Sequence, residues 1–95
     1  MLVEFHAAAQ AELIAAVEWY AERSEGLAQA LTLAVEEAIR RISERPEAWP
    51  MHYEGTRRYL LARFPYSVVY RKEQAKVVIV AVAHAKRHPS YWSSR

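Results

Sequence analysis

The last twelve residues of the chain hold most of the side chains that could contact a ligand or act on a substrate. Arginine makes bidentate contacts to phosphate and lysine offers a point charge, histidine titrates near neutrality, and an aromatic ring can stack on an exposed base. The segment from His84 to Arg95 combines all of these, so it predicts a nucleic-acid site. The alternative is a solubilising basic end whose aromatic rings pack back onto the protein. The residues concerned are His84, Lys86, Arg87, His88, Tyr91 and Trp92.

A second group of arginines precedes this segment and lies in a region typical of β-strands. Side chains alternate between the two faces of a strand, so only some of these arginines can share a face with the C-terminal segment. We expect Arg63 and Arg71 to add nucleic-acid contacts there. For Arg57 and Arg58 we favour the simpler interpretation, which is that of solvated strand ends.

Acidic residues give weaker indications of chemistry. Glu12, Glu18 and Glu22 fall in a helical pattern on the side away from its apolar residues, so we expect them to be solvated and to have no catalytic role. His52 and Glu54 lie in an irregular connection, where isolated polar residues are more often structural than catalytic.

Several other chemistries are disfavoured by what the sequence lacks. There is no cysteine, which excludes disulfides, thiolate metal sites and thiol catalysis. The two glycines do not form a phosphate-binding loop, and there is no nucleophile elbow of the GxSxG type. The four histidines do not have HExxH spacing, so we expect neither a metal nor another cofactor.

Length and charge indicate one domain with two different halves. The chain has 95 residues, which suits a single domain over residues 1–95. Residues 1–45 carry four arginines and eight glutamates, whereas residues 46–95 carry nine lysines or arginines and three glutamates. The second half is therefore the half suited to a polyanion. No signal peptide or membrane-spanning run is evident, so we expect a cytoplasmic protein.

The N-terminal half is predicted to form a strand followed by two helices. The apolar residues of the first six positions indicate a short strand. Apolar residues then recur at helical spacing from Ala8 to about Ser24 and again from Leu27 to the residue before Pro46. The short break between these segments predicts a helical hairpin.

The C-terminal half is predicted to form three strands after an irregular connection over residues 46–56. The expected strands are Arg57–Phe64, Tyr66–Lys72 and Lys76–His84, and the last is so continuously apolar that it suits a central strand buried on both faces. The result is an α+β fold of order β-α-α-β-β-β, with the helical hairpin on one face of a small, mainly antiparallel sheet. We expect the other face to be open.

The sequence from Arg58 to Arg71, the apolar strand after it and the segment His84-Ala85-Lys86-Arg87-His88-Pro89-Ser90-Tyr91-Trp92 together resemble the RelE/ParE toxin superfamily, which includes plasmid stabilisation proteins. The resemblance extends over essentially the whole chain. It implies a toxin of a bacterial type II toxin–antitoxin system and a cognate antitoxin that covers part of its surface. RelE-like members cleave mRNA on the ribosome, whereas ParE-like members poison DNA gyrase without chemistry of their own.

Within this resemblance, Arg87 corresponds to the basic residue that RelE-like members place against the scissile phosphate, and Tyr91 to a tyrosine that stacks on or activates the nucleotide. Lys86 adds charge beside them, and His84 or His88 could move a proton. Ser67 departs from the pattern, because RelE-like members usually have a catalytic arginine there. The first hypothesis is a ribosome-dependent endoribonuclease with Arg87, Tyr91 and His84 as catalytic residues. The alternatives are a gyrase poison and a non-toxic homologue that only binds antitoxin.

Overall fold

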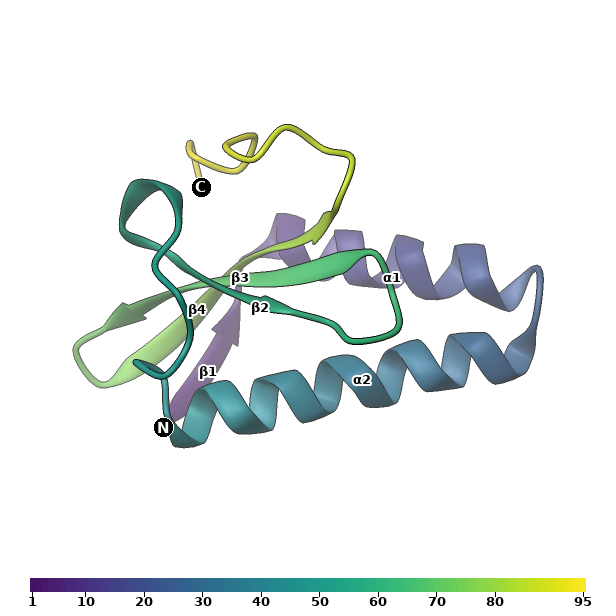
Figure 1. Cartoon of the computed structure of the whole chain (residues 1–95), viewed down its shortest axis with the longest axis horizontal. Helices are drawn as coiled ribbons and strands as arrows, with labels where there is room; N and C mark the ends of the chain where they lie inside the picture. The colour runs from purple at the N-terminus through teal and green to yellow at the C-terminus, as the bar shows by residue number, and fades with distance from the viewer.

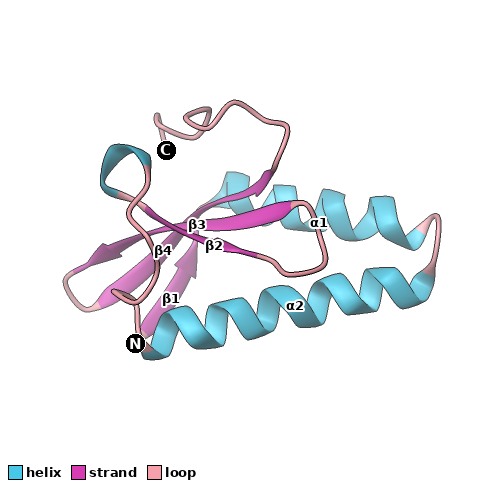
Figure 2. Cartoon of the chain, viewed as in Figure 1, coloured by secondary structure: helices cyan, strands magenta, loops and turns pink.

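The computed structural model describes residues 1–95 and has the predicted α+β architecture, with two helices on one face of a four-stranded sheet (Figures 1 and 2). Along the chain the elements follow the predicted order of one strand, two helices and three strands. Their bounds are β1 (Leu2–Phe5), α1 (Ala7–Ala21), α2 (Glu25–Glu44), the short 3-10 helix η1 (Tyr53–Gly55), β2 (Arg57–Leu60), β3 (Tyr66–Glu73) and β4 (Lys76–His84).

The sheet has the strand order β1-β4-β3-β2 and is mainly antiparallel, as predicted. β2, β3 and β4 form an antiparallel meander, and β1 pairs in parallel with β4. This places β4 inside the sheet, in agreement with its continuous apolar sequence. β1 pairs only with Lys76–Ile79, so the second half of β4 has no strand on that side.

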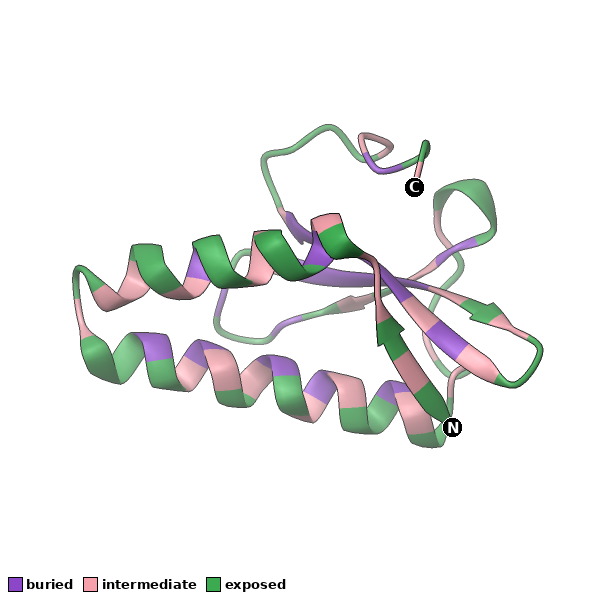
Figure 3. Cartoon of the chain, turned by 180° about the vertical axis from the view of Figure 1, so that it is seen from behind, coloured by how far each residue is buried: buried purple, intermediate pink, exposed green.

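The helical hairpin supplies the larger of two hydrophobic cores. α2 begins at Ser24, whose side chain accepts a hydrogen bond from the Leu27 amide, and it buries one regular stripe of side chains. Figure 3 shows these buried positions along the side of α2 that faces α1 and the sheet. The stripe packs against Val68, Tyr70 and the β4 residues that point the same way. Its members on α2 are Ala28, Leu31, Val35, Ala38 and Ile42.

The opposite face of the sheet is covered, which corrects the expectation that it is open. The residues after β4 turn back over this face toward η1, as the C-terminal segment in Figure 1 shows. Trp92 packs there against Val69, Val80 and neighbouring alanines in a second, smaller core. The pairing of β3 with β4 shifts by one residue here, since Val69 pairs with Ala81 and Tyr70 with Ile79. Val80 is the extra residue of the resulting bulge, and it belongs to this second core. We call residues 85–95 the tail.

One strand is shorter than predicted. β2 ends at Leu60 and not at Phe64, and residues 61–65 form an irregular turn. Leu61 and Phe64 are nevertheless buried, since the turn folds them into the core beneath the helices. Because they are buried, they are as hydrophobic as strand residues, which is why the sequence predicts a longer strand.

Candidate functional site

Glu12 on α1 is the residue to which the tail is attached, which corrects the expectation that its carboxylate is solvated. Its side chain is only 18% exposed. Tyr91 donates its hydroxyl hydrogen to Glu12 Oε2 at 2.7 Å, and both terminal nitrogens of Arg95 donate to the same carboxylate at 3.0 Å. This bidentate, charge-assisted geometry is the stronger type of ion pair.

The same carboxylate completes the free edge of β4. Because β1 ends opposite Ile79, backbone groups further along β4 have no strand partner on that side. The Val82 amide donates to Glu12 Oε1 at 3.0 Å, and the carbonyl of Val80 accepts from Arg95 Nη1 at 3.1 Å. Unpaired backbone groups are costly when buried, so α1 and the tail take over the role of a missing strand.

The sequence did contain a signal for Glu12. Ala9 and Ala16 are the buried residues of α1, and Glu12 lies three positions after the first and four before the second. It therefore belongs to the stripe that faces the sheet. The signal was easy to miss because α1 is apolar nearly all round, and its polar positions do not define a single solvated side.

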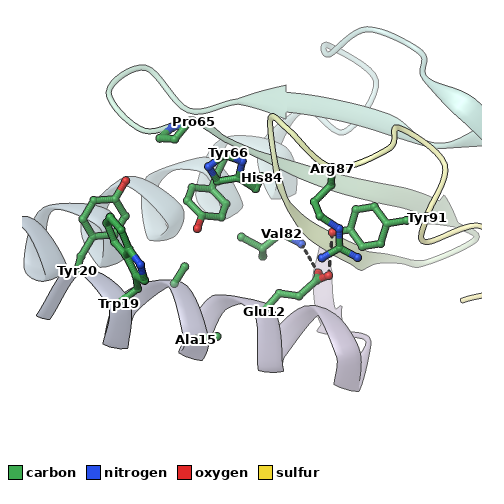
Figure 4. A pocket seen from close by; sticks show the side chains of 11 residues that line it. Glu12, Ala15, Trp19, Tyr20, Pro65, Tyr66, Val82, His84, Arg87 and Tyr91 are labelled. Atoms are coloured by element: carbon green, nitrogen blue, oxygen red, sulfur yellow. Dashed lines mark hydrogen bonds between the residues drawn. The ribbon is translucent and has the colours of Figure 1, made fainter. Parts of the chain in front are cut away.

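Tyr91 and Arg87, the two central residues of the predicted site, lie together. The guanidinium carbon of Arg87 is 3.9 Å from the centre of the Tyr91 ring, a cation–π contact. Figure 4 shows both side chains near Glu12, with the Tyr91 hydroxyl directed at the carboxylate. Burial and the hydrogen bond to Glu12 raise the pKa of Tyr91. Its hydroxyl is thus held neutral, with its proton on the bond to Glu12.

Trp92 does not offer an exposed base-stacking surface, which corrects the expectation that its ring stacks on a base. It is 2% exposed, and its ring stacks on His52 with centroids 5.2 Å apart. The alternative considered from the sequence, in which an aromatic residue of the tail packs onto the sheet, is the one found for Trp92. Its role is to fasten the tail to the sheet.

The two histidines of the predicted site have defined orientations. His84 Nδ1 accepts a hydrogen bond from the Lys86 amide, and His88 Nδ1 accepts one from the Ser90 amide. A neutral ring that accepts at Nδ1 carries its proton on Nε2, so both rings present donors at their outer nitrogens. Lys86 itself is exposed beside them.

The arginines on the strands are distributed differently from the prediction. Arg63 lies in the turn over residues 61–65 and lines neither of the pockets beside the tail. Arg71 is paired with Glu73 at 3.2 Å. Arg57 donates to the carbonyl of Trp49, a structural contact, whereas Arg58 lines a pocket next to the tail. Arg58, and not Arg63 or Arg71, is therefore the strand arginine that the structure brings to this site.

A cleft of about 520 Å³ lies between α1 and the start of the tail (Figure 4). Arg87, Tyr91 and Glu12 form one end of it, and Trp19 and Tyr20 on α1 form the other. Between these ends lie apolar residues and His84. The complete lining is Glu12, Ala15, Ala16, Trp19, Tyr20, Pro65, Tyr66, Val82, His84, Arg87 and Tyr91.

His52, which stacks on the tail, is expected to make folding sensitive to acid. Burial and the positive charge of Arg58 lower its pKa below the usual 6.5. As the pH falls from about 6.5 toward the lowered value, the unfolded chain binds a proton that the folded chain does not, so stability is lost in this window. The thermal unfolding midpoint should therefore decrease when the pH is lowered from about 7.5 to about 5, and it should decrease less in His52→Gln. An NMR titration of the His52 ring with its inflection above 6.5 would contradict this.

No group of three histidine, aspartate or glutamate side chains is arranged to hold a metal ion. Neither helix combines the length and the apolar sequence that a membrane span requires.

Comparison with known proteins identifies the family. The family model described as the ParE toxin of the type II toxin–antitoxin system parDE matches residues 3–89. A solved structure titled "Chromosomal ParDE TA system from P. aeruginosa" matches with a TM-score of 0.64 and 20% sequence identity, over 88% of this chain and 95% of that chain. At this identity the structural match shows the fold alone. No curated protein matches the sequence. Since the family model spans nearly all of the chain, this protein belongs to the ParE toxin family of type II toxin–antitoxin systems.

Proposed function

We propose that this toxin acts by binding and inhibiting DNA gyrase and does not cleave RNA. The observation that carries the proposal is the hydrogen bond from Tyr91 to Glu12. Cleavage of RNA needs a group that takes the proton of the 2′-hydroxyl and cations that stabilise the charged phosphate. Tyr91 is poorly suited to the first task, because its raised pKa disfavours the phenolate and its hydroxyl is already engaged.

The residue at position 67 also supports a binding function. Ser67 is 6% exposed and brings no positive charge to the face on which Arg87 and Arg58 lie. The tail, moreover, is fixed on both sides, by Trp92 in the sheet core and by Arg95 on Glu12. A tail held in this way presents a fixed surface to another protein, which suits a binding role.

A supercoiling assay with purified gyrase tests the proposal. The toxin alone should inhibit supercoiling or accumulate cleaved DNA, and Arg87→Ala should weaken this effect about tenfold or more, as expected for loss of a charged contact at an interface. Glu36→Ala on the exposed side of α2 is the matched control and should act like the unchanged toxin. If gyrase is unaffected at every toxin concentration, the proposal fails.

A ribosome-dependent endoribonuclease remains the second candidate, favoured by the outer nitrogens of His84 and His88 beside Arg87. Translating ribosomes incubated with the toxin would then yield mRNA cut at defined codon positions. Such cuts should disappear in Arg87→Ala and in His84→Ala. Cuts that persist in both variants would point to a contaminating nuclease, and no cuts at all would leave gyrase as the target.

We further propose a cognate antitoxin as partner and the cytoplasm as the place of action, since both candidate targets are found there. Induced expression without antitoxin should arrest growth. The failure of DNA synthesis before protein synthesis supports gyrase, and the reverse order supports the ribosome. Unimpaired growth would instead indicate a homologue that binds antitoxin and has lost toxicity.

A further inference from the structure

We infer that a small pocket between the tail and the sheet binds a single phosphate-type oxyanion. The pocket has a volume of about 60 Å³ and lies on the face of the sheet opposite the helices. Its wall comes from the η1 region, from β2, β3 and β4 and from the tail. The residues that line it are His52, Arg58, Ser67, Val69, Ala83, His84, Ala85, Arg87, His88, Pro89 and Trp92.

The polar groups around the pocket are almost all hydrogen-bond donors. Arg58 and Arg87 both line the pocket, and a guanidinium group has no acceptor atoms. The Arg87 guanidinium stacks on Tyr91 with its face, which leaves the N–H groups at its edge available as donors. His84 and His88 accept at Nδ1 from the tail backbone, so their Nε2 atoms are donors. No carboxylate lines the pocket. A ligand that only accepts hydrogen bonds and carries negative charge fits this set of groups.

Trp92 supplies an independent indication. It is 2% exposed and lines the pocket, and its indole nitrogen is buried without a hydrogen-bond partner. Buried polar groups in folded proteins nearly always have a partner, so an unpaired donor on a residue that lines a pocket calls for an explanation. An acceptor oxygen bound in the pocket provides one. The buried Ser67 hydroxyl lies in the same wall and can donate as well.

The size of the pocket selects one charged group and excludes a nucleobase. A single water needs roughly 10 to 15 Å³ by the same measure of volume, so the pocket has room for about four to six oxygen-sized atoms. A phosphate group has four oxygens. Stacking of a base is also prevented, because Trp92 is 2% exposed and one face of its ring is already covered by His52.

The residues around this pocket differ from the nucleic-acid-binding residues that the sequence predicts. Arg58, Ser67 and Trp92 become the oxyanion-binding residues, together with Arg87, and the remaining cations of the strands are left outside. The inference goes beyond gyrase inhibition and does not depend on it, because a phosphate group can belong to a nucleic-acid backbone or to a small molecule.

NMR titration of the full-length protein with inorganic phosphate tests the inference. The indole signal of Trp92 and the amide signals of Arg58 and Ser67 should shift together to saturation, while the indole signals of Trp19 and Trp49 stay in place. Sodium chloride at matched ionic strength should not reproduce the shifts. A second titration uses a thymidine hexanucleotide without terminal phosphates, in which every phosphate is a diester of the backbone.

Arg58→Ala should weaken phosphate binding about tenfold, since it removes a charge-assisted contact. Arg45→Ala, an exposed arginine at the end of α2, is the matched control and should bind like the unchanged protein. Tighter binding of the hexanucleotide than of phosphate would identify a nucleic-acid backbone as the ligand. Binding of inorganic phosphate without binding of the hexanucleotide would identify a free or terminal phosphate as the ligand. The inference is overturned if neither probe shifts the pocket signals, or if both arginine variants weaken binding equally.

Discussion

Trp92→Ala is expected to lower the free energy of unfolding by about 3 to 5 kcal/mol, the usual cost of removing a large buried aromatic side chain. Trp92 is 2% exposed and is the one fully buried side chain that the tail contributes to the core on the second face of the sheet, where Tyr91 packs only partly. Its loss would leave a cavity above Val69 and Val80 and expose apolar sheet surface. A small domain has a total stability of about 5 to 15 kcal/mol, so the loss is a large fraction.

Chemical denaturation followed by circular dichroism measures this change, and Trp19→Ala is its control. Trp19 is 49% exposed, so its replacement should cost far less. Trp92→Phe should be milder than Trp92→Ala, because it keeps an aromatic ring and removes the unpaired indole N–H. Equal stabilities for Trp92→Ala and Trp19→Ala would mean that the tail does not lie on the sheet in solution.

Glu12→Ala is expected to cost about 3 kcal/mol, a value typical of removing one partner from a largely buried ion pair. The substitution leaves Arg95 without its carboxylate and the Val82 amide without its acceptor. It also frees the hydroxyl of Tyr91. The tail should therefore loosen at its last residues, which faster cleavage by a protease near Arg95 would report.

Three further variants separate the parts of this contact. Glu18→Ala, on the exposed side of α1, should change stability by less than about 0.5 kcal/mol. Glu12→Gln keeps an acceptor oxygen and should lose less than Glu12→Ala. In a double-mutant cycle with Arg95→Ala, the two losses should be strongly non-additive, since both remove the same pair. Additive losses would contradict the ion pair as the attachment of the tail.

These two variants also bear on function. If the tail must be held in place to bind gyrase, Trp92→Ala and Glu12→Ala should both reduce inhibition of supercoiling at temperatures where they remain folded. Replacing Trp19, which lies at the other end of the large cleft, tests a different surface. A toxin that stays fully active with a detached tail would place the gyrase contact elsewhere on the domain.

Much of the fold was accessible from sequence because it depends on local patterns. Helical spacing of apolar residues located both helices, and the continuous apolar run identified β4 as an interior strand. The prediction for β2 was wrong at its end because Leu61 and Phe64 are as hydrophobic as strand residues, although they reach the core from a turn. Periodicity reports burial, and it does not distinguish these two ways of achieving it.

The sequence by itself determined the order of elements, the position of the helical hairpin and the family, and it singled out the tail as the segment rich in candidate functional side chains. Only the tertiary structure decided which contacts these side chains make. Tyr91 and Arg95 contact Glu12 across 79 and 83 positions of the chain, and Trp92 closes a sheet face that was expected to be open. The alternation of residues along a strand or helix carries no information on such distant contacts. They depend on where β1 ends, which leaves the edge of β4 for α1 and the tail to complete.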